Sequence, residues 1–167
     1  MTTRSARTAA CEDRSRKPAT PAVQYGQTEL VDVHFDDLDA MGIVHNARYA
    51  VLLERALSAY WSRHGFTFTN GRATQPDVFH AVAEYAISYR TPVRGTGPIG
   101  VHFWIERLGE SSATYGFRVQ SQDGTTVHAE GRRVNIKMDP VTLRPTPWTQ
   151  RACEVAARLQ KPVSGGL

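Results

Sequence analysis

The chain has 167 residues, of which 41% are hydrophobic and 22% are charged, and its formal net charge is +4. This length and composition predict one soluble globular domain with a substantial core, and no apolar run approaches the roughly 20 residues that span a bilayer. The positive balance is compatible with an anionic small ligand or an acidic partner, but it does not indicate nucleic-acid binding, because no aromatic residues are set among the basic ones.

Residues 1–27 are predicted to be a disordered tail. They lack the apolar core of a secretory signal, and Pro18 and Pro21 keep their last part extended. The two cysteines, Cys11 and Cys153, have neither the spacing of metal ligands nor that of a disulfide framework. We therefore expect a protein of the reducing cytoplasm.

The globular domain is predicted over residues 28–150. Residues 29–35 mostly alternate apolar and polar side chains, as a strand does, and from Asn46 the apolar residues recur at steps of three and four. The second pattern predicts a long helix that is apolar on most sides, capped by Asn46 and ended by Gly65.

Four further strands are predicted downstream, over residues 78–90, 99–108, 113–120 and 125–139. In the last of them the apolar residues change phase near Gly131, which suggests a β-bulge. A short helix and a tail are expected over residues 151–167. Hairpin-like links between the strands and one largely apolar helix indicate an α+β fold, in which an antiparallel sheet wraps around the helix.

Three carboxylates, Asp36, Asp37 and Asp39, stand just before the predicted helix, where capping needs only one. The segment DLDAMGIVHNARYAVLLERA that contains the last two resembles the signature of hotdog-fold acyl thioesterases, the 4-hydroxybenzoyl-CoA thioesterase-like superfamily. ISYRTPVRGTG, RLGESSATY and NIKMDPVTLRPTPW resemble later parts of the same family, in the same order. The resemblance covers about residues 29–148.

This resemblance implies a hotdog fold and an enzyme that hydrolyses an acyl-CoA or acyl-carrier-protein thioester. It implies that Asp39 is the nucleophile or the general base, and that the backbone amide of Asn46 at the helix start holds the oxyanion. A thiolate leaves readily, so no metal and no cofactor are expected. The family also implies a homodimer or homotetramer with sites shared between subunits.

Further residues are expected to bind the substrate. They lie around the motif, on the helix and on two strands: Gly42, His45, Tyr49, Glu54, His80, Arg132 and Arg133. Glu54 has two alternatives, a direct role or a structural salt bridge. The two arginines belong to a basic set whose other members are Arg90, Arg94 and Lys137. This set would bind the phosphates of coenzyme A or the acidic surface of a carrier protein. The alternative is that these residues form solvated strand faces.

Other functions stay open at this point. Asp36 and Asp37 are predicted to be turn or surface acids, and the six histidines show no metal-ligand spacing on a helix face. A hotdog dehydratase would need a histidine and an acid in a different motif. A non-catalytic acyl-thioester binding module is opposed by the presence of Asp39. The chain has no G-x-S-x-G elbow and no glycine-rich phosphate loop, which argues against a serine hydrolase and a P-loop enzyme.

Overall fold

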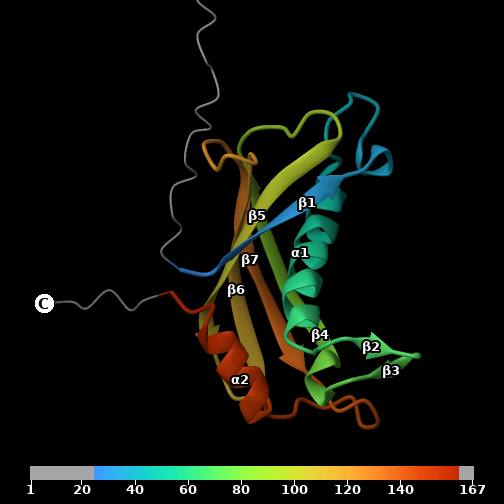
Figure 1. Ribbon diagram of the computed structural model, residues 1–167, viewed down its shortest axis with the longest axis vertical. Coiled ribbons are helices and arrows are strands. Elements are labelled where there is room, and N and C mark those ends of the chain that lie inside the picture. The colour runs from blue at the N-terminus through green and yellow to red at the C-terminus, as the bar shows by residue number, and fades with distance from the viewer. Residues whose placement is uncertain (1–24, 162–167) are drawn as a thin grey trace, which may run out of the picture.

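The computed structural model describes residues 25–161 (Figure 1). Most of the predicted tail, residues 1–24, and residues 162–167 lie outside the described part. One long helix, α1, runs along a five-stranded antiparallel sheet. The predicted α+β fold, an antiparallel sheet with one helix packed against it, is confirmed.

The sheet has the strand order β1-β5-β6-β7-β4. In chain order its strands are β1 (Gln27–Val33), β4 (His80–Tyr89), β5 (Gly97–Leu108), β6 (Ser112–Gln120) and β7 (Val127–Lys137). All the predicted strands are present, with ends shifted by a few residues. The segment after α1 contains a small hairpin of β2 (Phe68–Thr69) and β3 (Arg72–Ala73).

The α-helices are α1 (Tyr49–Arg63) and α2 (Gln150–Ala157). Three short 3-10 helices lie in the connections, over Phe35–Asp37, Asn46–Arg48 and Pro76–Val78. None of the helices in the described part is both long and apolar enough to cross a membrane.

The core lies between α1 and the sheet. Leu52, Leu53 and Ala56 of α1 are fully buried and share one hydrophobic cluster with Phe103 of β5 and Phe117 of β6. Burying a side chain of leucine or phenylalanine size stabilises the fold by about 1.5–3 kcal/mol. The helix is therefore held firmly in place, and with it the loop that leads into its first turn.

The start of α1 differs from the prediction. Asn46 does not cap it: Asn46 opens a separate 3-10 turn, and α1 begins only at Tyr49. The capping side chain is that of His45, whose Nδ1 accepts a hydrogen bond from the Ala47 N–H at 3.2 Å. Sequence preference favours asparagine at such a position, but a histidine ring nitrogen supplies the same acceptor. The end of the helix agrees with the prediction, because Gly65 follows it with a positive φ of 87°.

The bulge predicted near Gly131 is also misplaced. Gly131 pairs regularly with Phe117 on one side and Ile87 on the other. The register shifts between β4 and β7 at Val82/Glu84, and between β6 and β7 at Val119/Gln120, where His128 is skipped three residues before Gly131. A Cβ atom at Gly131 would come within 2.1 Å of the Ala86 carbonyl oxygen. Glycine inside a strand marks either a bulge or a close approach of neighbouring backbones, and Gly131 is a case of close approach.

Strand β4 forms one edge of the sheet, and in the described chain no element covers its outer side. Its side chains are mostly exposed, including the apolar Val82 at 51% and Tyr89 at 49%. Unpaired strand edges of this kind readily accept another strand.

Candidate active site

A cavity of about 370 Å³ lies where the segment before α1 meets the end of β4. We call it the Asp39 cavity. It brings together Asp39, His45, Asn46 and Tyr49 from the predicted set, and Tyr89 and Arg90 join them from the end of β4. Gly42 lies in the same turn but does not line the cavity.

The Asp39 side chain has one oxygen engaged in the turn. Its Oδ1 accepts hydrogen bonds from the Met41 N–H at 2.8 Å and the Ile43 N–H at 3.3 Å. Gly42, with a φ of 70°, gives the turn its sharp reversal. For Oδ2 no hydrogen-bond partner exists within residues 25–161. The carboxylate is thus fixed by one oxygen and keeps the other available.

A second segment, the connection between β4 and β5, holds this turn from outside. The Val44 N–H donates to the Val93 carbonyl at 2.9 Å, and the Gly95 N–H donates to the Gly42 carbonyl at 3.0 Å. Ile43 and Arg94 form an isolated antiparallel bridge between them. Two stretches that the family resemblance picks out separately are therefore neighbours in space.

The backbone at Asn46 offers a free donor. Its carbonyl accepts a hydrogen bond from the Tyr89 hydroxyl at 3.0 Å, while its N–H has no partner in the part of the chain that the structure describes. The preceding N–H, that of His45, donates to the Asp37 carbonyl at 2.9 Å. A free N–H at the start of a helix can stabilise an oxyanion that develops next to it.

Asp37 is a turn acid, as one of the two predicted alternatives had it, because it closes the 3-10 turn Phe35–Asp37, but it is fully buried and not a surface acid. Arg48 Nε donates to its Oδ1 at 2.7 Å, and Arg55 Nη1 and the His34 N–H donate to its Oδ2 at 2.7 and 2.8 Å. Burial alone would raise the pKa of Asp37, but the hydrogen bonds from Arg55, His34 and Arg48 outweigh it and lower the pKa to about 2. Asp36 is exposed and binds Arg48 at 2.7 Å.

The sequence did not single out the two arginines, Arg48 and Arg55, that pair with these acids. Arg48 and Arg55 are seven residues apart, or about two helical turns, so their side chains lie on the same side of the helical segment. That side faces the acids Asp36 and Asp37. His34, Asp36 and Asp37 also form a cluster whose ligand atoms lie within 4.8 Å of one another. Because the arginines already occupy its carboxylates, this cluster is a salt-bridge network rather than a free metal site.

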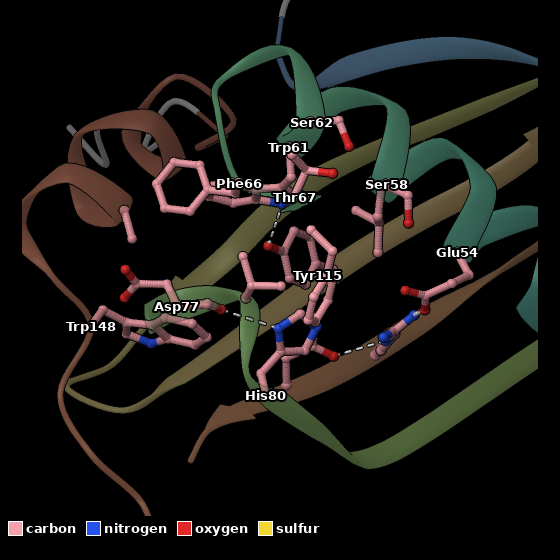
Figure 2. Close-up of a pocket in the computed structure, with 16 residues that line it drawn as sticks. Glu54, Ser58, Trp61, Ser62, Phe66, Thr67, Asp77, His80, Tyr115 and Trp148 are labelled. Atoms are coloured by element: carbon pink, nitrogen blue, oxygen red, sulfur yellow. Dashed lines mark hydrogen bonds and ion pairs between the residues drawn. The ribbon is translucent and has the colours of Figure 1, made fainter. Parts of the chain in front are cut away.

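Three other predicted residues lie together elsewhere. Glu54, His80 and Arg133 line a second cavity of about 390 Å³, which we call the α1-side cavity (Figure 2). Arg133 is buried and forms an ion pair with Glu54, and its Nε donates to Asn135 Oδ1 at 2.8 Å. The apolar part of the cavity wall is mostly aromatic, with Trp61, Phe66, Phe68, Tyr115 and Trp148.

The basic residues predicted on the last strand do not share a surface. Arg133 and Lys137 are buried, whereas Arg132 is exposed and pairs with Glu84 of β4. Adjacent residues of a strand point to opposite faces, so Arg132 and Arg133 cannot act on the same group. Lys137 is engaged inside the protein, with its Nζ 2.6 Å from the Pro147 carbonyl and 3.3 Å from Asp77 Oδ1.

Comparison with known proteins gives a consistent result. The family model described as the Thioesterase superfamily matches residues 41–128. The chain is 29% identical over 94 residues to YneP of Bacillus subtilis (strain 168), provisionally named an acyl-CoA thioesterase, which covers 56% of this chain and 67% of that protein. It is 24% identical over 115 residues to the acyl-CoA thioester hydrolase YbgC of Escherichia coli O6:H1, covering 69% of this chain and 84% of YbgC.

Among solved structures, the PA5185 protein of Pseudomonas aeruginosa strain PAO1 superposes with a TM-score of 0.75. The match covers 84% of this chain and 96% of PA5185, at 24% sequence identity. Similarity at this level demonstrates a shared fold.

We expect the Asp37→Asn substitution to destabilise the protein by about 3 kcal/mol, because it leaves two arginines facing a neutral group. The pKa of Asp37 lies below its ordinary value of 3.8, so its charge contributes full stability above that pH and loses the contribution as the pH falls toward 2. In urea unfolding the gap between wild type and variant should be constant from about pH 5 to pH 7 and shrink below pH 4. Asp36→Asn, which removes an exposed acid, is the control and should change stability by less than about 1 kcal/mol. Equal effects of the two substitutions would contradict the assignment.

Proposed function

The chain belongs to the thioesterase superfamily, and from this premise we propose that it hydrolyses acyl-CoA thioesters with Asp39 as the reacting carboxylate. Membership of the superfamily makes it a thioester hydrolase. Coenzyme A as the thiol is supported by YneP and YbgC, both named for acyl-CoA substrates. The observation that carries the proposal is the pairing, in one cavity, of a carboxylate with a free oxygen and a backbone donor at a helix start.

The chemistry follows from these two groups. In the first route, Asp39 Oδ2 takes a proton from water, and the water oxygen adds to the thioester carbonyl carbon. In the second, Oδ2 itself adds to that carbon, and water then cleaves the resulting anhydride. In both, the carbonyl oxygen becomes negatively charged and accepts a hydrogen bond from the Asn46 N–H. The C–S bond then breaks, and the thiolate leaves and takes up a proton.

Arginines at the rim of the Asp39 cavity supply charge for the phosphates of coenzyme A. Arg90 lines the cavity and shares Glu130 with Arg118. Arg94 is exposed, and within residues 25–161 it forms no salt bridge. The acidic surface of an acyl carrier protein would be attracted by the same residues, so a carrier-bound thioester is the alternative substrate.

We further propose that two copies pair through β4. A two-fold axis across this edge would join the sheets antiparallel and cover its exposed apolar side chains. Tyr89, at one end of β4, lines the Asp39 cavity, and His80, at the other end, lines the α1-side cavity. Antiparallel pairing would therefore place the Asp39 cavity of one copy beside the α1-side cavity of the other.

The role of Asp39 is tested by Asp39→Asn, which keeps an oxygen for the turn and removes the charge. We expect kcat for acyl-CoA hydrolysis to fall by at least about a hundredfold, as measured by thiol release, with an unchanged melting temperature. Asp36→Asn is the matched control and should retain most of the activity. An Asp39→Asn variant as active as wild type would place the reaction on another group.

The oxyanion donor is tested by Asn46→Pro. His45 has φ −61° and ψ 138°, which suits a residue before proline, and the first position of a helix favours proline, so the change removes little except the N–H. We expect a loss of about a hundredfold in kcat, equivalent to about 3 kcal/mol. Asn46→Ala keeps the N–H and should stay within a fewfold of wild type. If both variants lose activity equally, the side chain rather than the amide is needed.

The dimer is tested by Val82→Lys, which would bury a charge in the proposed interface. We expect wild type to have the mass of a dimer or tetramer in light scattering, and the variant to be monomeric and inactive. Leu30→Lys is the control, because Leu30 is similarly exposed, at 59%, on the opposite edge strand β1. Dimers that persist in the Val82→Lys variant would rule out this interface.

A further inference from the structure

The α1-side cavity combines aromatic and aliphatic residues with an equal number of polar ones, unlike a plain hydrocarbon pocket. In Figure 2, Glu54 and Trp148 lie on opposite sides of it, with His80 between them. Its volume of about 390 Å³ is within the range of small-ligand sites. A cavity meant only for an alkyl chain would gain nothing from these polar groups, since burying them costs free energy unless they are hydrogen-bonded.

Two side-chain donors of residues that line this cavity have no acceptor within residues 25–161, and one of them, the Trp148 Nε1, is a buried atom. Arg133 uses Nε on Asn135 and Nη1 on Glu54, whereas its Nη2 has no hydrogen-bond partner within residues 25–161. The indole Nε1 of Trp148 is buried and also lacks a partner in this part of the chain. An unpaired buried donor destabilises a protein. A ligand that supplies an oxygen would give these donors an acceptor.

The charges of the cavity are already balanced. Arg133 is neutralised by Glu54, and the buried Asp77 is neutralised by Lys137. Desolvation of the His80 ring where it lines the cavity is the main cause that lowers its pKa, which favours the neutral ring, although the residue as a whole is exposed. A carboxylate entering here would be an uncompensated negative charge near Glu54. A neutral oxygen would satisfy the donors without that cost.

His80 adds an acceptor to the two donors. Its Nδ1 lies 3.3 Å from the Asp77 carbonyl, which can only accept, so Nδ1 carries the proton and Nε2 keeps a free lone pair. A hydroxyl group can accept from Arg133 and donate to such a nitrogen, while an oxo group can only accept.

We propose that the α1-side cavity receives the acyl group and selects chains that carry a neutral oxygen substituent, a hydroxyl or an oxo group, with Arg133 as the specificity-determining residue. The inference rests on the proposed thioesterase function and on the β4 dimer, which brings the reaction centre of one copy to this cavity of the other. Arg133 acts on the remote end of the acyl group, away from the carbonyl carbon.

The test compares kcat/KM for straight-chain acyl-CoAs with that for their hydroxy, oxo and ω-carboxy derivatives of the same length. We expect wild type to prefer the hydroxy or oxo derivative at one chain position by about tenfold or more, the effect of a hydrogen bond to a charged donor. In the double variant Glu54→Gln/Arg133→Met, which removes both charges together, this preference ratio should fall to about twofold or less. The ratio compares two substrates of the same variant, so a general loss of activity does not affect it.

Arg132→Met is the matched control, because Arg132 is the neighbouring arginine on the opposite face of β7 and is likewise paired with a glutamate. Its preference ratio should equal that of wild type. Trp148→Phe removes one donor and keeps an aromatic wall, and should lower the ratio by about two- to tenfold; it serves if the double variant does not fold.

The outcomes separate the two proposals. Equal rates on plain and oxygenated chains by wild type, or a ratio unchanged in the Arg133 and Trp148 variants, would overturn this inference and leave the thioesterase function standing. A preference for the ω-carboxy derivative would overturn the neutral-oxygen assignment. Failure to hydrolyse any acyl-CoA in the panel would overturn the proposed function and this inference with it.

Discussion

The ion pairs of Asp37 with Arg48, in the 3-10 turn before α1, and with Arg55, in α1, are the interaction on which the candidate site depends. They tie the segment before α1 to the helix itself, whose own position is fixed by its packing in the core. Asp39 lies two residues from Asp37, and the His45 N–H donates to the Asp37 carbonyl. One buried acid therefore orients the carboxylate and the start of the helix at the same time, which is the kind of support that a preorganised site requires.

The molecule separates two tasks along β4. At the Tyr89 end the groups are a carboxylate and a backbone amide, held by turns and by the β4–β5 connection. At the His80 end they are aromatic walls and a buried arginine. The geometry at the Tyr89 end is set by the backbone and changes little when neighbouring side chains are substituted. The pocket at the His80 end is built from side chains, so any substitution there changes its shape or polarity.

Much of this arrangement could be predicted from the sequence, because periodicity and a local motif encode it. The strands and the long helix follow from alternation and from steps of three and four, and the ordered segments around Asp39 and Gly42 indicate the family. Local preferences were less reliable: a histidine took the capping position expected for Asn46, and Gly131 reflects a close strand approach instead of a bulge.

What could not be predicted depends on contacts between distant residues. Asp37 and Asp36 look alike in the sequence, yet only Asp37 is buried, where Arg48 of the 3-10 turn and Arg55 of α1 both reach it. Arg132 and Arg133 look like one basic pair, yet the alternation of the strand sends only the second into a cavity. The free donor of Trp148 comes from a segment close to α2 and carries no sequence signal.

The position of the two cavities at opposite ends of one edge strand has a genetic consequence. If copies pair through β4, each complete site takes its reacting carboxylate from one chain and its acyl pocket from the other. Two alleles, one without turnover because Asp39 is changed and one without the substrate preference because Arg133 is changed, would then complement each other in a mixed dimer, where one of the two sites has both residues. The same two lesions carried on a single chain would leave no intact site in any combination with itself.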